Sequence, residues 1–210
     1  EIRVGHKLIG IASSGLHSNG YSLVRKVCFE TLNLKIDEQI PELGKSIGEE
    51  LLTPTKIYAT TIAALIKDLP IHGIAHITGG GISENIVRVV PEACSILIRD
   101  ESWDVPAIFP FLQKGGNISA TEMARAFNMG IGMIVVVPDH AGRVQGFGEI
   151  AAVHQPPHRA CPDAARPGNP LPTCAACPAR TAHTAKAASA SVRPRRRRAV
   201  RFLGSTSRTR

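Results

Sequence analysis

Apolar side chains in the N-terminal two thirds of the chain form short continuous runs separated by glycine-containing turns. Runs at residues 7–12, 73–77 and 95–98 have the length and composition that are typical of β-strands. The run at 131–137 contains no polar residue and is rich in β-branched side chains. Such a run predicts a central strand that is buried on both faces.

Helices are predicted where apolar residues recur every three or four positions. The clearest helix follows Thr53-Pro54, because threonine is a good N-cap and proline suits a first helical turn. A single helical face then carries Tyr58, Ile62, Leu65, Ile66 and Leu69. We expect this face to pack against the core.

The other predicted helices are shorter. They begin after the first glycine turn, with Ser18 or Asn19 as the cap, and at 83–90, 108–113 and 119–127. Ser119 and Glu122 have the spacing of a capping box at the last of these. The polar stretch at 33–45 contains proline and glycine, and it predicts a surface loop.

Strands and helices therefore mix along residues 1–150, which predicts one α/β (α+β) domain built as a layered mixed sheet with flanking helices. Residues 151–210 are different, because they are rich in alanine, proline and arginine and show no sustained apolar period. Too little apolar surface is available there to offset a backbone entropy of about 1–2 kcal/mol per residue. We expect residues 151–210 to be a disordered tail.

The net charge of +8 is concentrated in that tail. Residues 1–150 hold 13 Lys and Arg against 16 Asp and Glu, a net charge of −3. Residues 151–210 hold 12 Lys and Arg and one acid, Asp163, a net charge of +11. The predicted domain is thus mildly acidic, and its composition does not indicate nucleic-acid binding.

Several protein classes are disfavoured by the sequence. No apolar run reaches the roughly 18 residues of a membrane span, and the N-terminus lacks the basic start and apolar core of a signal peptide. An odd number of cysteines, five, without a secretion signal argues against a disulfide framework. We expect a cytoplasmic protein. The chain starts without Met, almost directly in a strand, which indicates a fragment of a longer protein.

Glycine-containing turns follow two of the predicted strands. In the first turn, at 10–20, glycine lets the backbone approach a ligand, and hydroxyl groups add hydrogen-bond donors. The residues there that suit a phosphate are Ser13, Ser14, Gly15, Ser18, Asn19 and Gly20. The second turn consists of Thr78, Gly79, Gly80 and Gly81. A plain strand-to-helix turn would have the same composition, so both interpretations stay open on spacing alone.

A third glycine turn, at 127–132, leads into the predicted central strand. His17 and His76 each lie beside a glycine turn, where a histidine serves either a structural or a catalytic role. We assign no metal-binding residue.

Four short sequence phrases, taken together, are more specific evidence than the spacing of their residues alone. They read Ser-Ser-Gly-Leu-His-Ser-Asn-Gly-Tyr-Ser-Leu-Val-Arg at 13–25, Leu-Leu-Thr-Pro-Thr-Lys-Ile-Tyr at 51–58, Ala-His-Ile-Thr-Gly-Gly-Gly at 75–81 and Phe-Asn-Met-Gly-Ile-Gly-Met at 127–133. In this order and at these distances, they make the chain similar to the C-terminal domain of aminoimidazole ribonucleotide synthetase. The likeness runs from the N-terminus to the strand at 131–137.

The resemblance implies an ATP-dependent cyclo-ligase of de novo purine biosynthesis, which closes formylglycinamidine ribonucleotide to aminoimidazole ribonucleotide. Each subunit of the homodimeric family enzyme has two α/β domains, and this chain would be the C-terminal half. ATP and Mg²⁺ are expected to bind mainly through the N-terminal half. We therefore expect the isolated chain to be inactive.

The resemblance also implies that the first two turns face the cleft between the two domains. The residues expected there are Ser14, His17, Ser18, Asn19, Thr78, Gly79 and Gly80. His17 would donate a hydrogen bond to a phosphate or move a proton. The chain departs from the family after residue 138, where only 146–150 is similar to the family's last strand, the helix before it is missing, and the tail has no counterpart.

Three alternatives remain open. The basic run at 193–198 would bind a polyanion, although aromatic side chains for stacking are scarce there. Cys174-x-x-Cys177 has the spacing of zinc ligands, but no second pair follows; the nearby candidates are Cys161, His158 and His183. Thiamine-monophosphate kinases, selenophosphate synthetases and the glutamine-using purine synthetase share the two-domain architecture and use ATP, but the phrase at 13–20 favours the cyclo-ligase.

Overall fold

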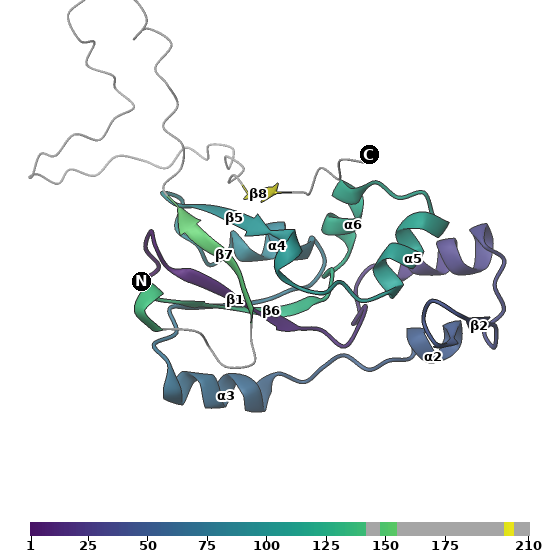
Figure 1. The fold of residues 1–210 in the computed structure, drawn as a ribbon, viewed down its shortest axis with the longest axis horizontal. Coiled ribbons are helices and arrows are strands. Elements are labelled where there is room, and N and C mark those ends of the chain that lie inside the picture. Colours follow the sequence, from purple (N-terminus) through teal and green to yellow (C-terminus); the bar gives the residue numbers. More distant parts are fainter. Residues whose placement is uncertain (142–147, 155–199, 204–210) are drawn as a thin grey trace, which may run out of the picture. The chain divides into compact units, whose positions relative to one another are not determined.

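The computed structural model of the chain describes residues 1–141, 148–154 and 200–203. Its centre is a six-stranded sheet with the strand order β4-β6-β1-β7-β5-β8 (Figure 1). The strands are β1 (Lys7–Ala12), β4 (Gly73–His76), β5 (Ser95–Arg99), β6 (Ile131–Val137), β7 (Gly148–His154) and β8 (Val200–Leu203). Neighbouring strands are antiparallel except β5 and β8, which are parallel. The prediction of a mixed sheet is confirmed.

Strand β6 is central, as its unbroken apolar run predicts. It pairs with β1 on one side and with β4 on the other. Ile134 and Val136 belong to the core on one face of the sheet, and Val135 and Val137 belong to the core on the opposite face. Because both faces of the sheet are covered here, a polar side chain in β6 would be buried, and its loss of hydration would lower the stability of the domain.

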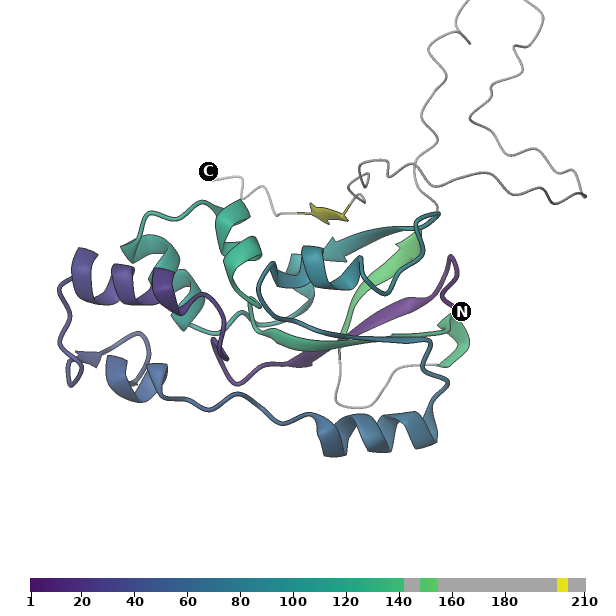
Figure 2. The same ribbon diagram turned by 180° about the vertical axis from the view of Figure 1, so that it is seen from behind.

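One helix covers each face of this part of the sheet. Helix α3 (Ala59–Asp68) packs through Leu65 and Ile62 on one face, together with Tyr58. Helix α4 (Gly81–Ile86) packs through Ile82 and Ile86 on the other. Figures 1 and 2 show α3 and α4 on opposite sides of the strands.

A second apolar core lies among the remaining helices. They are α1 (Tyr21–Arg25), which continues as the π-helix η1 (Lys26–Thr31), α2 (Ile47–Leu51), α5 (Ile108–Gly115) and α6 (Ala120–Ala126). Phe109 and Phe127 lie at its centre, fully buried, with ring centroids 5.9 Å apart. The short elements are η2 (Asp100–Ser102), η3 (Asp139–Ala141) and the hairpin strands β2 (Gln39–Ile40) and β3 (Lys45–Ser46).

The prediction that a helix begins at Thr53-Pro54 is wrong. Residues 53–58 lack helical structure, and α3 begins only at Ala59. Tertiary hydrogen bonds hold this segment, because Ser14 Oγ donates to the Pro54 carbonyl and the Tyr58 hydroxyl donates to the carbonyl of Ala12. We call residues 52–58 the strap. Ile66, which was expected on the packed face of the helix, is 56% exposed.

Two further local predictions need correction. The cap of α1 is neither Ser18 nor Asn19 but Gly20, whose φ of 75° is left-handed and which makes no side-chain capping bond. The predicted loop at 33–45 contains β2 and the start of β3. The Ser119 cap is confirmed, since its side chain accepts from the Glu122 N–H.

The boundary at residue 150 and part of the predicted tail also need correction. Strand β7 crosses residue 150 and ends at His154, because residues 151–154 pair with β5 or β1. Strand β8 pairs with the outer edge of β5. The rest of the predicted disordered tail lies outside the described residues, as do the basic run at 193–198 and the zinc-ligand candidates. No helix in the described part of the chain is long and apolar enough to cross a membrane.

Candidate functional site

The three glycine turns that the sequence singled out pack against one another. A Cβ atom placed on Gly79 would lie 4.0 Å from Asn19 Oδ1, so the second turn adjoins the first. A Cβ atom on Gly20 would contact the ring of Phe127, which opens the third turn. Segments that are separated by about 50 residues in sequence, at 13–20, 78–81 and 127–132, thus form one site at the ends of β1, β4 and β6.

Gly81 shows why this packing requires glycine. Its φ of 61° is left-handed, and a Cβ atom there would collide with the carbonyl oxygen of Ala124 and lie 3.0 Å from that of Phe127. Any other residue would therefore suffer both backbone strain and overlap. The second turn is fixed tightly against the end of α6.

Asn128 connects the first turn to the third. Its side chain is fully buried, and its Nδ2 donates to the carbonyls of Gly15 (2.8 Å) and Leu16 (3.3 Å). Its Oδ1 accepts from the Gly130 N–H (2.8 Å) and from Ser13 Oγ (3.2 Å). One buried amide therefore satisfies the polar groups of two turns, which fixes their relative position.

Asn85 has the corresponding role in the second turn. It is 3% exposed, and its Nδ2 donates to the carbonyls of Thr78 and Gly79, both at 3.2 Å, and of Gly81 at 2.8 Å. Its Oδ1 accepts from Thr78 Oγ1 at 3.1 Å. The backbone of the glycine turn is thus held in place by this one side chain.

The strap holds the outer side of the first turn. Ser14 Oγ donates to the Pro54 carbonyl at 2.6 Å, and Ser18 Oγ shares a hydrogen bond of 3.1 Å with Thr55 Oγ1. Ser13 Oγ donates to the Gly15 carbonyl at 2.9 Å. The serine hydroxyls that were expected to serve a ligand are thus already engaged within the protein.

His17 is the least satisfied polar side chain of the site. It is 5% exposed, with a left-handed φ of 58°, and its Nε2 accepts from the Ser14 N–H at 3.1 Å. A neutral imidazole that accepts at Nε2 carries its proton on Nδ1. Nδ1 is buried without a hydrogen-bond partner among the described residues. The site therefore contains an unpaired N–H donor.

The surroundings of His17 favour its neutral form. Burial lowers the pKa of His17, and electrostatic interactions with His76 and Lys56 lower it further. The Tyr58 ring lies near both histidines, with its centroid 6.0 Å from that of His17 and 6.2 Å from that of His76. Burial raises the pKa of Tyr58 to about 12, so this hydroxyl stays protonated.

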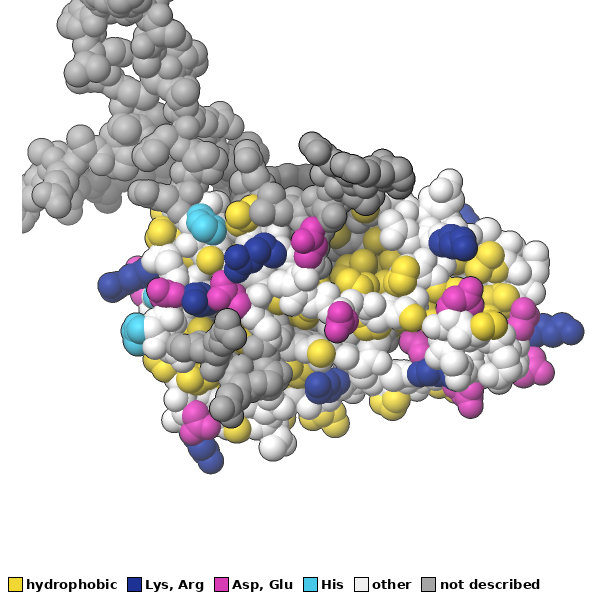
Figure 3. Space-filling view, in the orientation of Figure 1, with side chains coloured by type: hydrophobic (Ala, Val, Ile, Leu, Met, Phe, Trp, Pro, Cys, Tyr) yellow, Lys and Arg dark blue, Asp and Glu magenta, His cyan; other side chains and the backbone are white. Residues whose placement is uncertain are grey.

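The described residues offer no metal centre. No group of three or more His, Cys, Asp or Glu side chains converges in that part of the chain. Acidic and basic side chains are interspersed on the face shown in Figure 3. No group of residues in this part of the chain can be assigned as a complete set of Mg²⁺ ligands.

Sequence reasoning located the three turns but missed the two residues that organise them. Asn128 stood inside one of the recognised phrases and Asn85 four residues after another, yet an asparagine in or near a turn is usually explained by local backbone bonding. Asn128 bonds residues more than 110 positions away. The signal available was their position inside or just after a glycine turn.

Comparison with known proteins gives a consistent result. Residues 3–152 match the family described as AIR synthase related protein, C-terminal domain. The phosphoribosylformylglycinamidine cyclo-ligase of Citrifermentans bemidjiense is 55% identical over 158 residues, which cover 73% of this chain and 45% of that protein. The cyclo-ligase of Syntrophotalea carbinolica is 56% identical over 138 residues, which cover 66% and 39%. The chain spans less than half the length of these curated relatives.

Among solved structures, thiamine monophosphate kinase from Aquifex aeolicus matches with a TM-score of 0.46 and 18% identity, over 73% of this chain and 48% of that one. The family match and the cyclo-ligase relatives agree with the four phrases in the glycine turns and the strap. The chain belongs to the AIR synthase related protein family and constitutes its C-terminal domain.

Proposed function

We propose that this chain is the C-terminal half of a phosphoribosylformylglycinamidine cyclo-ligase, and that its glycine turns bind phosphate oxygens during ATP-dependent ring closure in purine biosynthesis. The relatives at 55% and 56% identity support the assignment of the activity. The observation that carries the proposal within this chain is the unpaired Nδ1–H of His17, at the junction of the turns.

The tautomer of His17 distinguishes between its two expected roles. Nε2 is occupied by the Ser14 N–H, and the protonated Nδ1 is a donor that cannot accept a proton. The lowered pKa of His17 further favours the neutral ring. We therefore assign His17 as a hydrogen-bond donor to an anionic oxygen, and not as a general base.

Contact with a ligand requires the first turn to shift, because Nδ1 is covered by protein atoms. An unpaired buried donor costs about 1–3 kcal/mol, and a phosphate oxygen that meets Nδ1 would recover that free energy. The left-handed backbone of His17 is the kind of strain that is often found at ligand-binding segments. Binding and rearrangement of the turn are thus coupled.

The remaining site residues are proposed as the walls of the same anion site. Ser14, Ser18 and Gly79 are exposed at its surface, and Asn19 lies partly buried between the two turns. They are proposed with Ser13, Gly15, Gly20, Thr78, Gly80 and Gly81. When bound, ATP supplies the phosphoryl group that activates the formyl oxygen; the residues of this chain hold phosphate oxygens and exclude water.

The other half of the enzyme is required by this proposal. We propose that Mg²⁺ and most of the nucleotide bind there, because the described residues contain no metal-ligand cluster. Formylglycinamidine ribonucleotide as the substrate, a homodimer as the assembly and the cytoplasm as the location remain predictions for the full-length protein.

The test joins the N-terminal half of the Citrifermentans bemidjiense enzyme to residues 1–154 of this chain. Formation of ADP and of the imidazole product is followed by mass spectrometry. We expect the chimera to close the ring only with ATP and the chain alone to be inactive. A folded chimera without ring closure, or turnover by the chain alone, would contradict the proposal.

Two substitutions test the role of His17 in that chimera. His17→Asn keeps an amide N–H near the position of Nδ1 and tolerates the left-handed backbone. His17→Gln instead keeps a polar group near Nε2 and loses the Nδ1 donor. If His17 acts as a donor, the Asn variant retains more activity, and the acidic limb of the pH profile does not depend on residue 17.

A further inference from the structure

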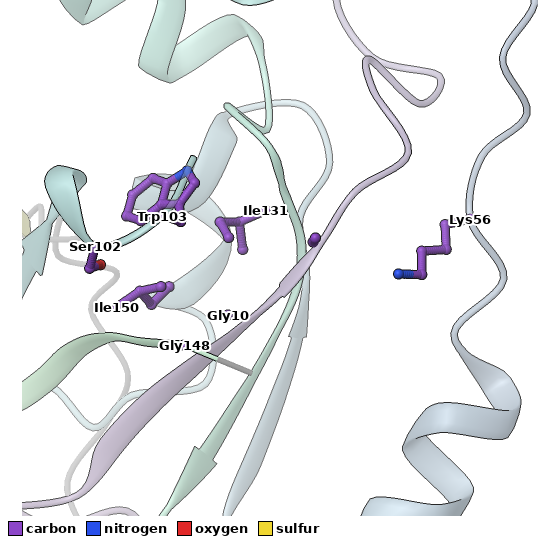
Figure 4. Close-up of a pocket in the computed structure, with 8 residues that line it drawn as sticks. Gly10, Lys56, Ser102, Trp103, Ile131, Gly148 and Ile150 are labelled. Atoms are coloured by element: carbon purple, nitrogen blue, oxygen red, sulfur yellow. The ribbon is translucent and has the colours of Figure 1, made fainter. Parts of the chain in front are cut away.

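A pocket of about 310 Å³ opens beside the turns, and the anion site does not use it. Its lining consists of Gly10, Ala12, Lys56, Ser102, Trp103, Ile131, Gly148 and Ile150. Figure 4 shows Trp103, Ile131 and Ile150 grouped together, and Lys56 reaching from the strap with its amine directed toward β1. In that view β1 runs between Lys56 and the three apolar side chains, so the apolar and cationic parts of the lining lie on either side of this strand.

Two glycines of the sheet belong to the lining of this pocket. Gly10 in β1 and Gly148 in β7 are direct partners in the antiparallel ladder, so two neighbouring positions lack side chains. Ile131 and Ile150 beside them are 3% and 1% exposed and serve as fixed apolar walls. A Cβ atom on Gly10 would lie 2.8 Å from the Ile150 side chain and 3.0 Å from that of Ile131, so these two walls cover Gly10. The open part of the pocket is therefore over Gly148, where a Cβ atom meets nothing closer than 3.5 Å.

Trp103 provides a flat wall with a fixed orientation. Its indole Nε1 donates to the Met129 carbonyl at 2.9 Å, which ties the ring to the third glycine turn. The ring therefore presents a face for stacking without a further loss of rotamer freedom.

Lys56 gives the pocket its charge. It forms no ion pair with any residue that the structure describes, and its Nζ lies 5.8 Å from the centroid of the Tyr58 ring. A cation with a free ammonium group at the end of an apolar pocket suits an anionic substituent on a bound molecule.

We propose that this pocket binds a flat aromatic or heteroaromatic ring of one or two fused rings, with an anionic group directed toward Lys56. Its volume, about 310 Å³, is at the lower end of the range for small-molecule pockets, about 300–1,000 Å³. It is about twice that of a cavity of about 150 Å³ that holds benzene.

The pocket adjoins the anion site through the backbone. Ala12 lines the pocket and precedes Ser13, and Ile131 follows Gly130 of the third turn. In the enzyme proposed above, the ring would be the base of a nucleotide whose phosphate lies at the first turn. That assignment of the ring rests on the proposed function, but the pocket and its ligand class do not.

Trp103 is the single tryptophan of the chain, so its fluorescence reports on the pocket directly. The full chain is titrated with AMP, adenosine and ribose 5-phosphate, and heats of binding are measured in parallel. We expect AMP and adenosine to change the emission, with AMP binding more tightly, and ribose 5-phosphate to leave it unchanged. Lys56→Gln should weaken the binding of AMP by about three- to tenfold and leave the binding of adenosine unchanged. Lys67→Gln, an exposed lysine in α3, is the matched control and should change neither.

The substitution Gly148→Val tests whether the ligand binds in this pocket. A Cβ atom at Gly148 meets nothing closer than the Ser102 carbonyl oxygen at 3.5 Å, so the valine fits the strand and fills the open part of the pocket. Binding of both AMP and adenosine should fall at least about tenfold. Ala12→Phe fills the pocket from the exposed end of β1, and it replaces Gly148→Val if circular dichroism shows that this variant is unfolded.

The proposal is overturned if AMP and adenosine leave Trp103 emission unchanged in the folded chain, or if the filled variants bind them as well as the parent does. Heat of binding from ribose 5-phosphate without any response to adenosine would support the anion site and refute the pocket. Binding of adenosine without binding of ribose 5-phosphate would support the pocket and count against the anion site.

Discussion

Asn128 offers the most direct test of how the site is held together. Replacing it by alanine removes an amide that donates to the Gly15 and Leu16 carbonyls and accepts from the Gly130 N–H and Ser13 Oγ. Alanine cannot replace any of these four bonds. Ser13 Oγ keeps its hydrogen bond to the Gly15 carbonyl, so this hydroxyl loses only one of its two partners.

The expected loss of stability follows from these contacts. A hydrogen bond contributes about 0.5–1.5 kcal/mol net, and a buried group that is left unpaired costs about 1–3 kcal/mol. The Gly130 N–H is left without its acceptor in a fully buried environment, and the two carbonyls lose a shared donor. We expect the free energy of unfolding to fall by about 3–5 kcal/mol, a large part of the roughly 5–15 kcal/mol of a typical domain.

Urea denaturation followed by circular dichroism measures this loss. With a denaturant slope of about 2 kcal/mol per molar, the midpoint should fall by about 1.5–2.5 M. Gln113→Ala is the control, because that amide forms no side-chain hydrogen bond in the described structure, and it should cost less than about 0.5 kcal/mol beyond its effect on the helix. A loss below about 1 kcal/mol for Asn128→Ala would refute the reasoning that this amide joins the two turns.

Three further predictions concern other parts of the molecule. Gly81→Ala should lower the thermal unfolding midpoint, measured by calorimetry, by several degrees or prevent folding, because the methyl group meets the Ala124 carbonyl at a left-handed φ. Burial lowers the pKa of His17, so the unfolded chain binds more protons than the folded chain below about pH 6.5. The free energy of unfolding should therefore fall as the pH falls from 7 to 5. In urea titrations, His17→Asn should make the free energy of unfolding less dependent on pH. His6, whose pKa is also lowered by burial first, should retain part of the slope in that variant. Burial raises the pKa of Cys28 to about 11, so iodoacetamide at pH 8 should label Cys28 only after unfolding, as peptide mapping would show; rapid labelling of the folded chain would contradict its burial.

The sequence predicts the sheet better than the helices. Strands β1 and β6 begin and end where their apolar runs do, because a strand buried on both faces requires a continuous run. The strap was mistaken for a helix, since the Thr-Pro pair is a good local start signal but hydrogen bonds from Ser14 and Tyr58 tie this segment to the first turn and to β1. Local propensity could not predict bonds to residues more than 35 positions away.

The site was predicted in the same partial way. Glycines mark where backbones approach, so the sequence located the turns around residues 13–20 and 78–81. It did not show that the serine hydroxyls bond within the protein or that a buried amide joins two turns, because these partners are distant in sequence. Helix α2 was also missed, although Ser46 and Glu49 form a complete capping box at its start.

The pairing of β1 has a consequence for how the chain folds during synthesis. Lys7 pairs with Val137 on one side and with Ala152 on the other, so its two partners leave the ribosome 130 and 145 residues after it. At about 5–20 residues per second, the apolar strand waits roughly 7 to 26 s for its first partner. Such distant pairing slows folding and leaves Leu8 and Ile11 open to aggregation in the nascent chain. We therefore expect β1 to be bound by chaperones until β6 has emerged, and the completion of the sheet to be a late event in folding.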